Sequence, residues 1–286
     1  MPIDYQTLLN WKIPQVEHAF TVRDTMLYAL GTGLGHDPLD ESQLRFVYEK
    51  DLAALPTMAI ILGYPGPWHR DPKTGVDGSK VVHGEQGFRI HRLLPVQGTV
   101  IGRSRVTGVF DKGEGRGALI QTATDVTMQG SGELVCSLTS TSFARANGGF
   151  GGPSGPTREP HALPSRKPDM ICDLPTLPQA ALIYRLSGDY NPLHAEPAFA
   201  KRAGFNAPIL HGRCTFGIAG HAILKTCCAY DSARLIAMEG RFSAPVFPGE
   251  TVRTEMWQDG NVISFRALIA DRDAVVLTGG RAEVAA

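Results

Sequence analysis

Residues 184–194, with the sequence YRLSGDYNPLH, hold the side chains that are best suited to acid–base chemistry. An ionised carboxylate at Asp189 and a neutral imidazole at His194 can hold one water molecule and exchange its proton near neutral pH. Asn191 lies between them in the sequence and can orient either partner. The segment therefore predicts a site that activates water.

The residues around this pair predict where the polar groups lie. Three apolar residues at helical spacing are expected to form the buried face of a helix over 178–187: Leu182, Ile183 and Leu186. Gly188 is expected to end that helix, and Pro192 cannot continue it. The polar residues should then share a short irregular segment. The same spacing also fits a purely structural turn, in which Asp189 and Asn191 cap backbone amides and His194 caps the next helix.

A second element supports the chemical interpretation. A short helix is expected from Pro197 to Gly204, and a longer apolar helix over 215–226, so Gly212 should lie at a helix N-terminus. Backbone amides there have no partner within the helix and carry the positive end of its dipole. Such an amide can stabilise a developing oxyanion.

The motifs SGDYNPLH at 187–194 and LHG at 210–212 resemble those of a known family, the hydratase 2 or MaoC-like (R)-specific enoyl-CoA hydratases, which includes part of peroxisomal multifunctional enzyme type 2. The resemblance covers nearly the whole chain. It rests on SGDYNPLH, on LHG at 210–212, on YALGTG at 28–33, on HGEQ at 83–86 and on FPGE at 247–250. It implies reversible hydration of a trans-2-enoyl-CoA to a (3R)-3-hydroxyacyl-CoA without a metal or other cofactor.

The resemblance also implies roles for individual residues. The catalytic set would be Asp189, His194, Asn191 and Gly212. The substrate- and coenzyme A-binding set would be His83, Gly84, Lys112, Tyr190 and Phe242. Simpler interpretations exist for His83 as part of a polar turn before a strand, for Lys112 as an exposed turn lysine and for Phe242 as a core residue.

Other candidate residues favour structural interpretations. Glu85 and Gln86 are expected to be structural, and strand alternation should point Arg241 away from the face that carries Phe242. His211 fits a structural cap next to Gly212. The buried helical position of His221 is typical of a core histidine with satisfied hydrogen bonds. The glycines of 31–35 follow a helix rather than a strand, which argues against a dinucleotide fingerprint.

The chain predicts a helix followed by strands, twice. In the first half we expect a short helix over 23–34, a buried strand over 55–63, no long helix in 64–87 and an antiparallel meander over 88–143. In the second half four strands are expected near 234–243, 250–258, 261–271 and 274–284. Short turns join these strands, which disfavours a parallel α/β architecture.

These patterns predict an α+β fold with two domains. The predicted domains are 1–144 and 170–286, joined by a Gly/Pro-rich linker over 145–169. When residues 28–30 are aligned with residues 184–186 as an internal repeat, the first copy has no acid/base pair. The first domain would instead bind the acyl chain and coenzyme A. The resemblance implies a tandem (double) hotdog fold, in which antiparallel sheets wrap around helices. The first copy should lack the long central helix, leaving an apolar groove for an acyl chain.

Composition limits the classes of partner and compartment. The 286 residues include 28 basic and 28 acidic side chains, and this balance argues against nucleic acid or an anionic membrane as the main partner. The five cysteines show no CxxC spacing and are expected to be reduced. We expect no signal peptide, transmembrane segment or C-terminal peroxisomal signal, hence a cytoplasmic protein. A homodimer is expected from the family.

Two alternatives to a hydratase follow from the sequence. A hotdog acyl-CoA thioesterase could use Asp189 and water to attack the thioester carbon, although Asn191 and His194 favour hydration. A catalytically silent acyl-CoA-binding protein is disfavoured by the intact pair of Asp189 and His194. The product distinguishes the three: a 3-hydroxyacyl-CoA, free coenzyme A thiol, or no product.

Overall fold

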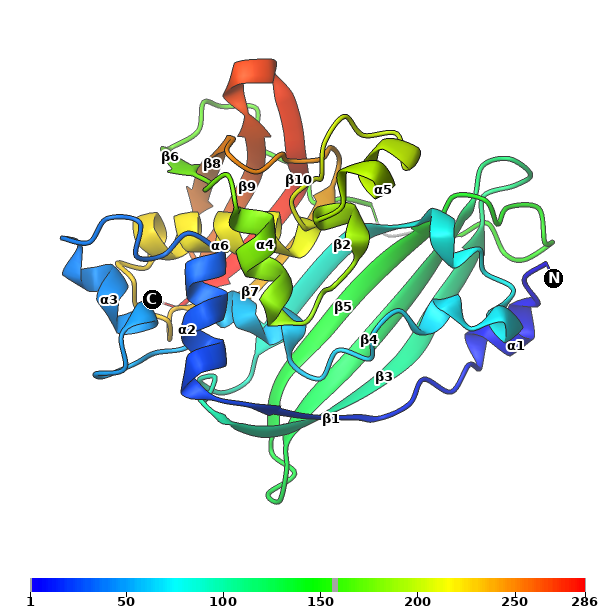
Figure 1. Cartoon of the computed structure of the whole chain (residues 1–286), viewed down its shortest axis with the longest axis horizontal. Helices are drawn as coiled ribbons and strands as arrows, with labels where there is room; N and C mark the ends of the chain where they lie inside the picture. Colours follow the sequence, from blue (N-terminus) through cyan, green and yellow to red (C-terminus); the bar gives the residue numbers. More distant parts are fainter. Residues whose placement is uncertain (1, 156–158, 286) are drawn as a thin grey trace.

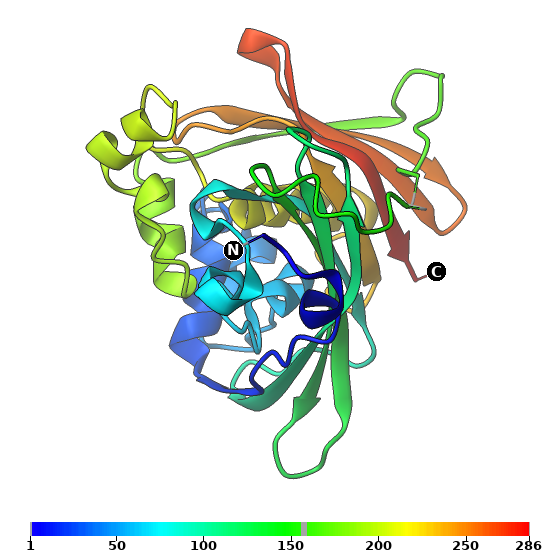
Figure 2. The ribbon, with the colours of Figure 1, turned by 90° about the vertical axis from the view of Figure 1, so that its right-hand side faces the viewer.

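A single curved antiparallel sheet organises the chain. The computed structural model describes residues 2–155 and 159–285. Its sheet has ten strands in the order β1-β3-β4-β5-β2-β7-β10-β9-β8-β6, and the helices lie on its concave side (Figures 1 and 2). The strands are β1 (Val16–Phe20), β2 (Val81–Ile90), β3 (Gly98–Asp111), β4 (Ala118–Met128), β5 (Leu134–Ala144), β6 (Met170–Pro175), β7 (Leu235–Phe242), β8 (Thr251–Asp259), β9 (Val262–Ile269) and β10 (Ala274–Val284).

The two halves of the chain occupy the two halves of the sheet. Strands β1–β5 form one side, β6–β10 form the other, and β2 pairs with β7 at the junction, where Gly87 faces Glu239. The predicted meander and the four predicted strands of the second half are confirmed. The edge strands β1 and β6 were missed, because each is short and has little continuous apolar pattern.

Helix α6 (Gly212–Cys227) is the central helix. Its residues from Cys214 to Leu224 are all buried, since the sheet covers one side and the other helices cover the rest (Figure 1). Close packing requires small residues here: a Cβ atom at Gly220 would lie 2.3 Å from Cγ2 of Thr57. The remaining helices are α1 (Tyr5–Leu9), α2 (Val22–Gly31), α3 (Glu41–Val47), α4 (Ala180–Tyr184) and α5 (Pro197–Arg202).

Helices α2 and α4 pack beside each other on the face of α6 that is turned away from the sheet (Figure 1). The rings of Tyr28 and Tyr184, which the repeat places at equivalent positions, have centroids 5.9 Å apart. Both tyrosines are fully buried. The two copies of the short helix therefore meet through the residues that the repeat predicts to correspond.

As predicted, the first half has no counterpart of α6: within its described residues the longest helix is α2, with ten residues. The strand predicted over 55–63 is wrong. Residues Pro56–Ile61 form a buried 3₁₀ helix, η1, which packs against α6 and β2. Pro56 has no amide for a strand ladder and its fixed φ suits a first helical position, whereas a short apolar run alone does not distinguish the two structures.

The Gly/Pro-rich segment forms no helix or strand in its described part, but it is tied to both sides of the sheet. The carboxylate of Asp111 accepts hydrogen bonds from the amides of Gly149 and Gly151, at 2.7 and 2.8 Å. Further along, Nε1 of Trp257 donates to the carbonyl oxygen of Arg166 at 2.8 Å. The division at 144 and 170 into two domains stays a prediction.

None of the helices in the described residues has both the length and the apolar character that a bilayer span requires.

Candidate active site

The segment that follows α4 brings the predicted polar residues together. Helix α4 continues as a 3₁₀ turn, Arg185–Ser187, and ends at Gly188, whose φ of 104° is in the left-handed region. The predicted buried face was wrong: Leu182 and Leu186 are 53% and 52% exposed. The helix instead buries Tyr184. The ring of Tyr184 packs against Tyr28 of α2, which is the corresponding residue of the first copy of the repeat.

Asp189 and Asn191 shape the turn that carries the histidine. Oδ1 of Asp189 accepts a hydrogen bond from the amide of Asn191, and Oδ1 of Asn191 accepts one from the amide of Leu193, both at 3.2 Å. These are the backbone caps that the structural interpretation predicts. They leave Oδ2 of Asp189 without a turn bond, so a structural and a chemical role coexist in this carboxylate.

His194 does not cap the next helix, so that part of the structural interpretation is wrong. Its Nδ1 lies 2.8 Å from the carbonyl oxygen of Ile209. A carbonyl oxygen only accepts, so Nδ1 carries the proton and the neutral ring keeps a lone pair on Nε2. The ring is 8% exposed, and its burial lowers the pKa of His194 below the ordinary value of 6.5. His194 is therefore held neutral as a proton acceptor.

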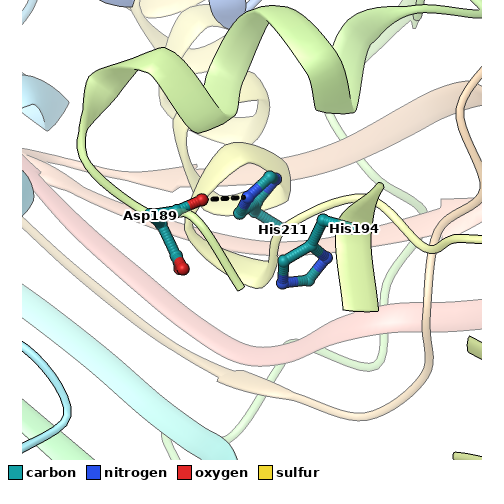
Figure 3. A group of neighbouring side chains, drawn as sticks. All are labelled: Asp189, His194 and His211. Carbon is teal, nitrogen blue, oxygen red and sulfur yellow. Dashed lines mark hydrogen bonds between the residues drawn. The ribbon is translucent and has the colours of Figure 1, made fainter. Parts of the chain in front are cut away.

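His211 is a site residue that the sequence interpretation missed. Its ring stacks on that of His194 with centroids 3.7 Å apart and an interplanar angle of 28°. Its Nε2 donates to the main-chain oxygen of Asp189 at 3.0 Å, as Figure 3 shows. Burial, followed by the neighbouring His194, lowers the pKa of His211 to about 3. Its place directly before Gly212 was the sequence signal that could have found it.

These three residues form a compact group that could also hold a metal ion. One ligand atom from each of Asp189, His194 and His211 lies within 4.8 Å of the others. Stacked imidazoles, however, point their in-plane lone pairs side by side, whereas a tetrahedral zinc site needs them to converge. Each ring donates from one nitrogen to a carbonyl oxygen, an arrangement that metal-binding and metal-free histidines share. The geometry suits a water molecule better, and the absence of a cofactor stays a prediction.

Gly212 begins α6, as predicted, with His211 as the residue before it. A Cβ atom at Gly212 would lie 3.3 Å from the ring of Phe242, so the aromatic ring packs directly on this glycine. The absence of a side chain keeps the first amides of the helix accessible to a ligand oxygen. Phe242 therefore lies against the start of α6, and its contact with a ligand stays a prediction.

His83 and Gly84 reach the same place from β2. The ring centroid of His83 is 4.7 Å from that of Phe242, and its Nε2 lies 3.0 Å from Oγ of Ser140. Burial lowers the pKa of His83 to about 3, which keeps the ring neutral. The register of β2 against β5 shifts between His83 and Glu85, so Gly84 is the extra residue of a β-bulge. The expected polar turn is thus an irregular point within a strand.

The neighbours of this bulge have structural partners, as expected. Oε1 of Glu85 accepts from Nη2 of Arg241 at 2.6 Å, and this pair lies away from Phe242. Nε2 of Gln86 donates to the carbonyl oxygen of Thr139 at 2.9 Å. His221 is also a core residue, with Nε2 3.1 Å from the hydroxyl of Tyr230.

Lys112 and Tyr190 are not members of the three-residue group of Figure 3. Nζ of Lys112 donates to the carbonyl oxygen of Ser154 at 2.8 Å. Tyr190 is 60% exposed, and the guanidinium of Arg185 lies 5.0 Å from its ring centroid. Their roles in coenzyme A binding stay predictions.

A pocket of about 350 Å³ opens beside Asp189 and is lined mainly by the first half of the chain. Strand β1, helices α2 and η1, and Tyr64 form its walls, in the half that lacks a long helix. The sequence predicts an apolar groove there, and Phe20, Leu27, Met58 and Ile61 supply apolar walls. The lining also includes the charged residues Glu17, Asp24 and Arg213, which that prediction did not include.

Buried polar atoms without a partner gather around the site. Among the described residues, four of the seven such side-chain atoms belong to the end of α4, to the turn that follows it and to the stacked histidine: Tyr184 Oη, Arg185 Nε, Ser187 Oγ and His211 Nδ1. Buried polar atoms are normally hydrogen-bonded, so unpartnered ones here indicate a place for water or a ligand. Tyr184, Arg185 and Ser187 had no assigned role in the sequence interpretation.

The fold defines a protein with two hotdog-like halves, and its described residues include a compact group of one carboxylate and two stacked imidazoles. Comparison with known proteins agrees. Residues 18–146 match the MFE-2 hydratase 2 N-terminal domain, and residues 160–278 match the MaoC-like domain. A protein from Mycobacterium tuberculosis described as having a double hotdog fold superposes with a TM-score of 0.57 at 16% identity, over 96% of this chain and 94% of its own, which supports the fold alone.

Nearer relatives give the family. Peroxisomal enoyl-CoA hydratase 2 of Arabidopsis thaliana is 39% identical over 95% of this chain and 93% of its own length. The crystal structure of a MaoC-like dehydratase from Phytophthora capsici superposes with a TM-score of 0.84 at 36% identity, over 98% of each chain. The chain belongs to the MaoC-like hydratase 2 family.

Proposed function

We propose that this protein is a lyase that reversibly hydrates a trans-2-enoyl-CoA to a (3R)-3-hydroxyacyl-CoA. The hydrogen bond from Nδ1 of His194 to Ile209 is the observation that carries this proposal, because it leaves Nε2 as a proton acceptor beside Asp189. Family membership supports the same reaction, since the Arabidopsis relative is named as an enoyl-CoA hydratase.

In the forward reaction one water molecule lies between Asp189 and His194. Nε2 of His194 accepts a proton from the water molecule while the water oxygen forms a bond to C3 of the enoyl group. The C2–C3 π electrons move toward the thioester carbonyl, and a proton from the Asp189/His194 pair then bonds to C2. The pair ends in its starting protonation state, so the net change is addition of H and OH. Asp189 and His194 lie close together, so both would act from one side of the substrate and add the water to a single face.

Gly212 would stabilise the negative charge that develops on the thioester oxygen. Amides in the first turn of α6 have no partner within the helix, and the helix dipole favours an anion there. Phe242 packs on Gly212 and would hold the thioester against these amides. A preorganised donor of this kind lowers the barrier because the charge exists only in the transition state and intermediate.

The remaining predicted residues support this arrangement. Asn191 would position His194 by capping the 3₁₀ turn Pro192–His194, with its Oδ1 3.2 Å from the amide of Leu193. His83 and Gly84 would line the thioester side of the site next to Phe242. Lys112 and Tyr190 would contact coenzyme A at the surface.

Hydration is favoured over thioester cleavage by the named relative and by the paired Asp189 and His194. We further propose an acyl-CoA substrate, a homodimer and no metal or redox cofactor. The cytoplasmic location stays a prediction, since the Arabidopsis relative is named as peroxisomal.

One experiment tests the reaction directly. The protein is mixed with a medium-chain trans-2-enoyl-CoA, loss of the conjugated thioester is followed, and the product is identified by chiral analysis. A (3R)-hydroxy product is expected. Release of free thiol with an intact enoic acid would instead show a thioesterase. Tight binding of several esters without turnover would show a silent binding protein.

A further inference from the structure

The charged residue Arg213 has no role in the hydration chemistry, yet it lines the pocket beside Asp189. It follows Gly212 in the first turn of α6 and is half-buried. Its guanidinium carbon lies 3.9 Å from the ring centroid of Tyr64, on the opposite half of the chain. The ring contact fixes the position of the cation at the junction of the two halves.

Most arginines of the described chain have a carboxylate or another oxygen acceptor as a partner, and Arg213 has neither. In the part of the chain that the structure describes, no carboxylate forms an ion pair with it and no oxygen accepts a hydrogen bond from it. The ring of Tyr64 is its ring contact, and its charge adds to burial in lowering the pKa of His83. By contrast, Arg241, Arg253 and Arg272 pair with carboxylates at 2.6 to 2.7 Å. The nitrogens of Arg213 are not among the buried polar atoms without a partner, so water reaches them, and a ligand that supplies oxygen acceptors could replace that water.

The acidic residues of the same pocket are engaged elsewhere or lie in water. Oδ2 of Asp24 accepts from the amide and the hydroxyl of Thr21 at the start of α2, at 2.8 and 2.6 Å. Oδ1 of Asp189 accepts from the amide of Asn191. Glu17 is exposed on the edge strand β1. The free donors of Arg213 are thus available to an occupant of the pocket.

We propose that Arg213 recognises an oxygen acceptor on the acyl part of the substrate. This inference deepens the proposed function and rests on it: the preferred enoyl thioester would carry a carbonyl or carboxylate oxygen beyond the double bond. The apolar walls formed by Phe20, Leu27 and Met58 would contact the carbon chain leading to that oxygen. A planar guanidinium matches such oxygens with two parallel hydrogen bonds, and its stacking on Tyr64 preorganises the fork.

The test compares three trans-2-enoyl-CoA esters of equal chain length, ending in a methyl group, a methyl ketone or a carboxylate. For the wild-type protein, kcat/KM should be at least about tenfold higher for one of the oxygen-bearing esters than for the methyl-ended ester, since hydrogen bonds to charged groups are stronger than neutral ones. In R213M this ratio should fall to about one, mainly through KM. R213K, which keeps the charge but loses the fork, should recover part of the preference.

R202M provides the matched control. Arg202 is an exposed arginine of the same half that also stacks on an aromatic ring, Phe199, at 5.3 Å, but it does not line the pocket. Its variant should keep the wild-type ratio. Equal kcat/KM values for all three esters in the wild-type protein would overturn the proposal, as would an R213M variant in which KM rises equally for all esters, because Arg213 would then bind coenzyme A. Failure of all three esters to react would instead refute the proposed hydratase.

Discussion

The imidazole of His194 lies with Nδ1 2.8 Å from the carbonyl oxygen of Ile209, a residue on the segment that leads into α6. This bond fixes both the tautomer and the orientation of the ring, because the carbonyl oxygen can only accept. It also ties the turn that carries Asp189 to the helix that presents Gly212. The pair proposed to activate water and the amides proposed to stabilise the oxyanion are thus connected by a direct hydrogen bond between their segments.

Replacing Asp189 by Asn should remove most turnover while the protein stays folded. The amide keeps the shape of the side chain and can still accept from the backbone of Asn191, but it cannot exchange a proton. We expect kcat to fall by about a hundredfold or more. Turnover is measured with the enoyl-CoA assay, and binding of an unreactive saturated acyl-CoA serves as the control. Near-normal kcat would exclude Asp189 from the chemistry.

Activity should decline on the acid side with a midpoint below pH 6.5. Burial lowers the pKa of His194 in the folded protein, so the ring stays neutral and competent down to that lowered value. Protonation of Nε2 at still lower pH removes the proton acceptor. The profile of kcat/KM against pH reports this value for the free enzyme. An acid limb centred above pH 6.5 would contradict the role assigned to His194.

Stability should also fall with acid, through histidines that are buried in the neutral form. His83 and His211 have folded pKa values of about 3 against 6.5 for the ordinary side chain, both because burial disfavours the charged ring. The unfolded chain therefore binds more protons between these values. The free energy of unfolding should be at its full value above pH 6.5 and decrease as the pH falls from 6.5 toward 3. Urea unfolding at several pH values measures this slope.

A histidine variant outside the active site tests whether buried neutral histidines cause the loss of stability in acid. H221Q replaces a third buried histidine, whose pKa burial lowers to about 4, outside the active site. The slope of unfolding free energy against pH between 6.5 and 4 should be smaller in H221Q than in the wild-type protein. An unchanged slope would show that the buried histidines do not control acid stability.

His211 should act as a positioning residue. Its ring supports His194 by stacking, and its Nε2 holds the main chain of Asp189. H211F keeps a stacked ring but loses the hydrogen bond, so we expect kcat to fall by about tenfold to a hundredfold while KM changes little. A purely structural role would lower the melting temperature and leave kcat of the folded fraction unchanged. Comparison of kcat, KM and melting temperature distinguishes the two.

Gly220 should be intolerant of alanine although alanine favours helices. A Cβ atom there would lie 2.3 Å from Cγ2 of Thr57 on η1. We expect G220A to lower the free energy of unfolding by about 1–3 kcal/mol, the usual cost of overpacking, despite a helix-propensity gain of about 1 kcal/mol. T57A should reduce that loss in the double variant. Higher stability of G220A would contradict the close packing of α6 and η1.

Prediction from the sequence succeeded where a local pattern has a single structural meaning. The glycine after α4 and the strands after residue 234 follow from chain geometry and alternation, and they are confirmed. It failed at Pro56–Ile61, where a short apolar run fits a buried strand and a buried 3₁₀ helix equally. It also failed at Leu182 and Leu186, because helical spacing shows that residues share a face but not which face the rest of the protein covers.

By itself, the sequence determined the chemistry that is available: a carboxylate and an imidazole on one short segment, and a glycine at the start of the following long helix. Spacing sufficed there because those groups are close along the chain. The tertiary structure alone decided that His211 stacks on His194, that Phe242 packs on Gly212 and that Arg213 enters a pocket built by the first half. These contacts depend on how the two halves pack around α6, and local backbone geometry does not specify packing between segments that are distant in the chain.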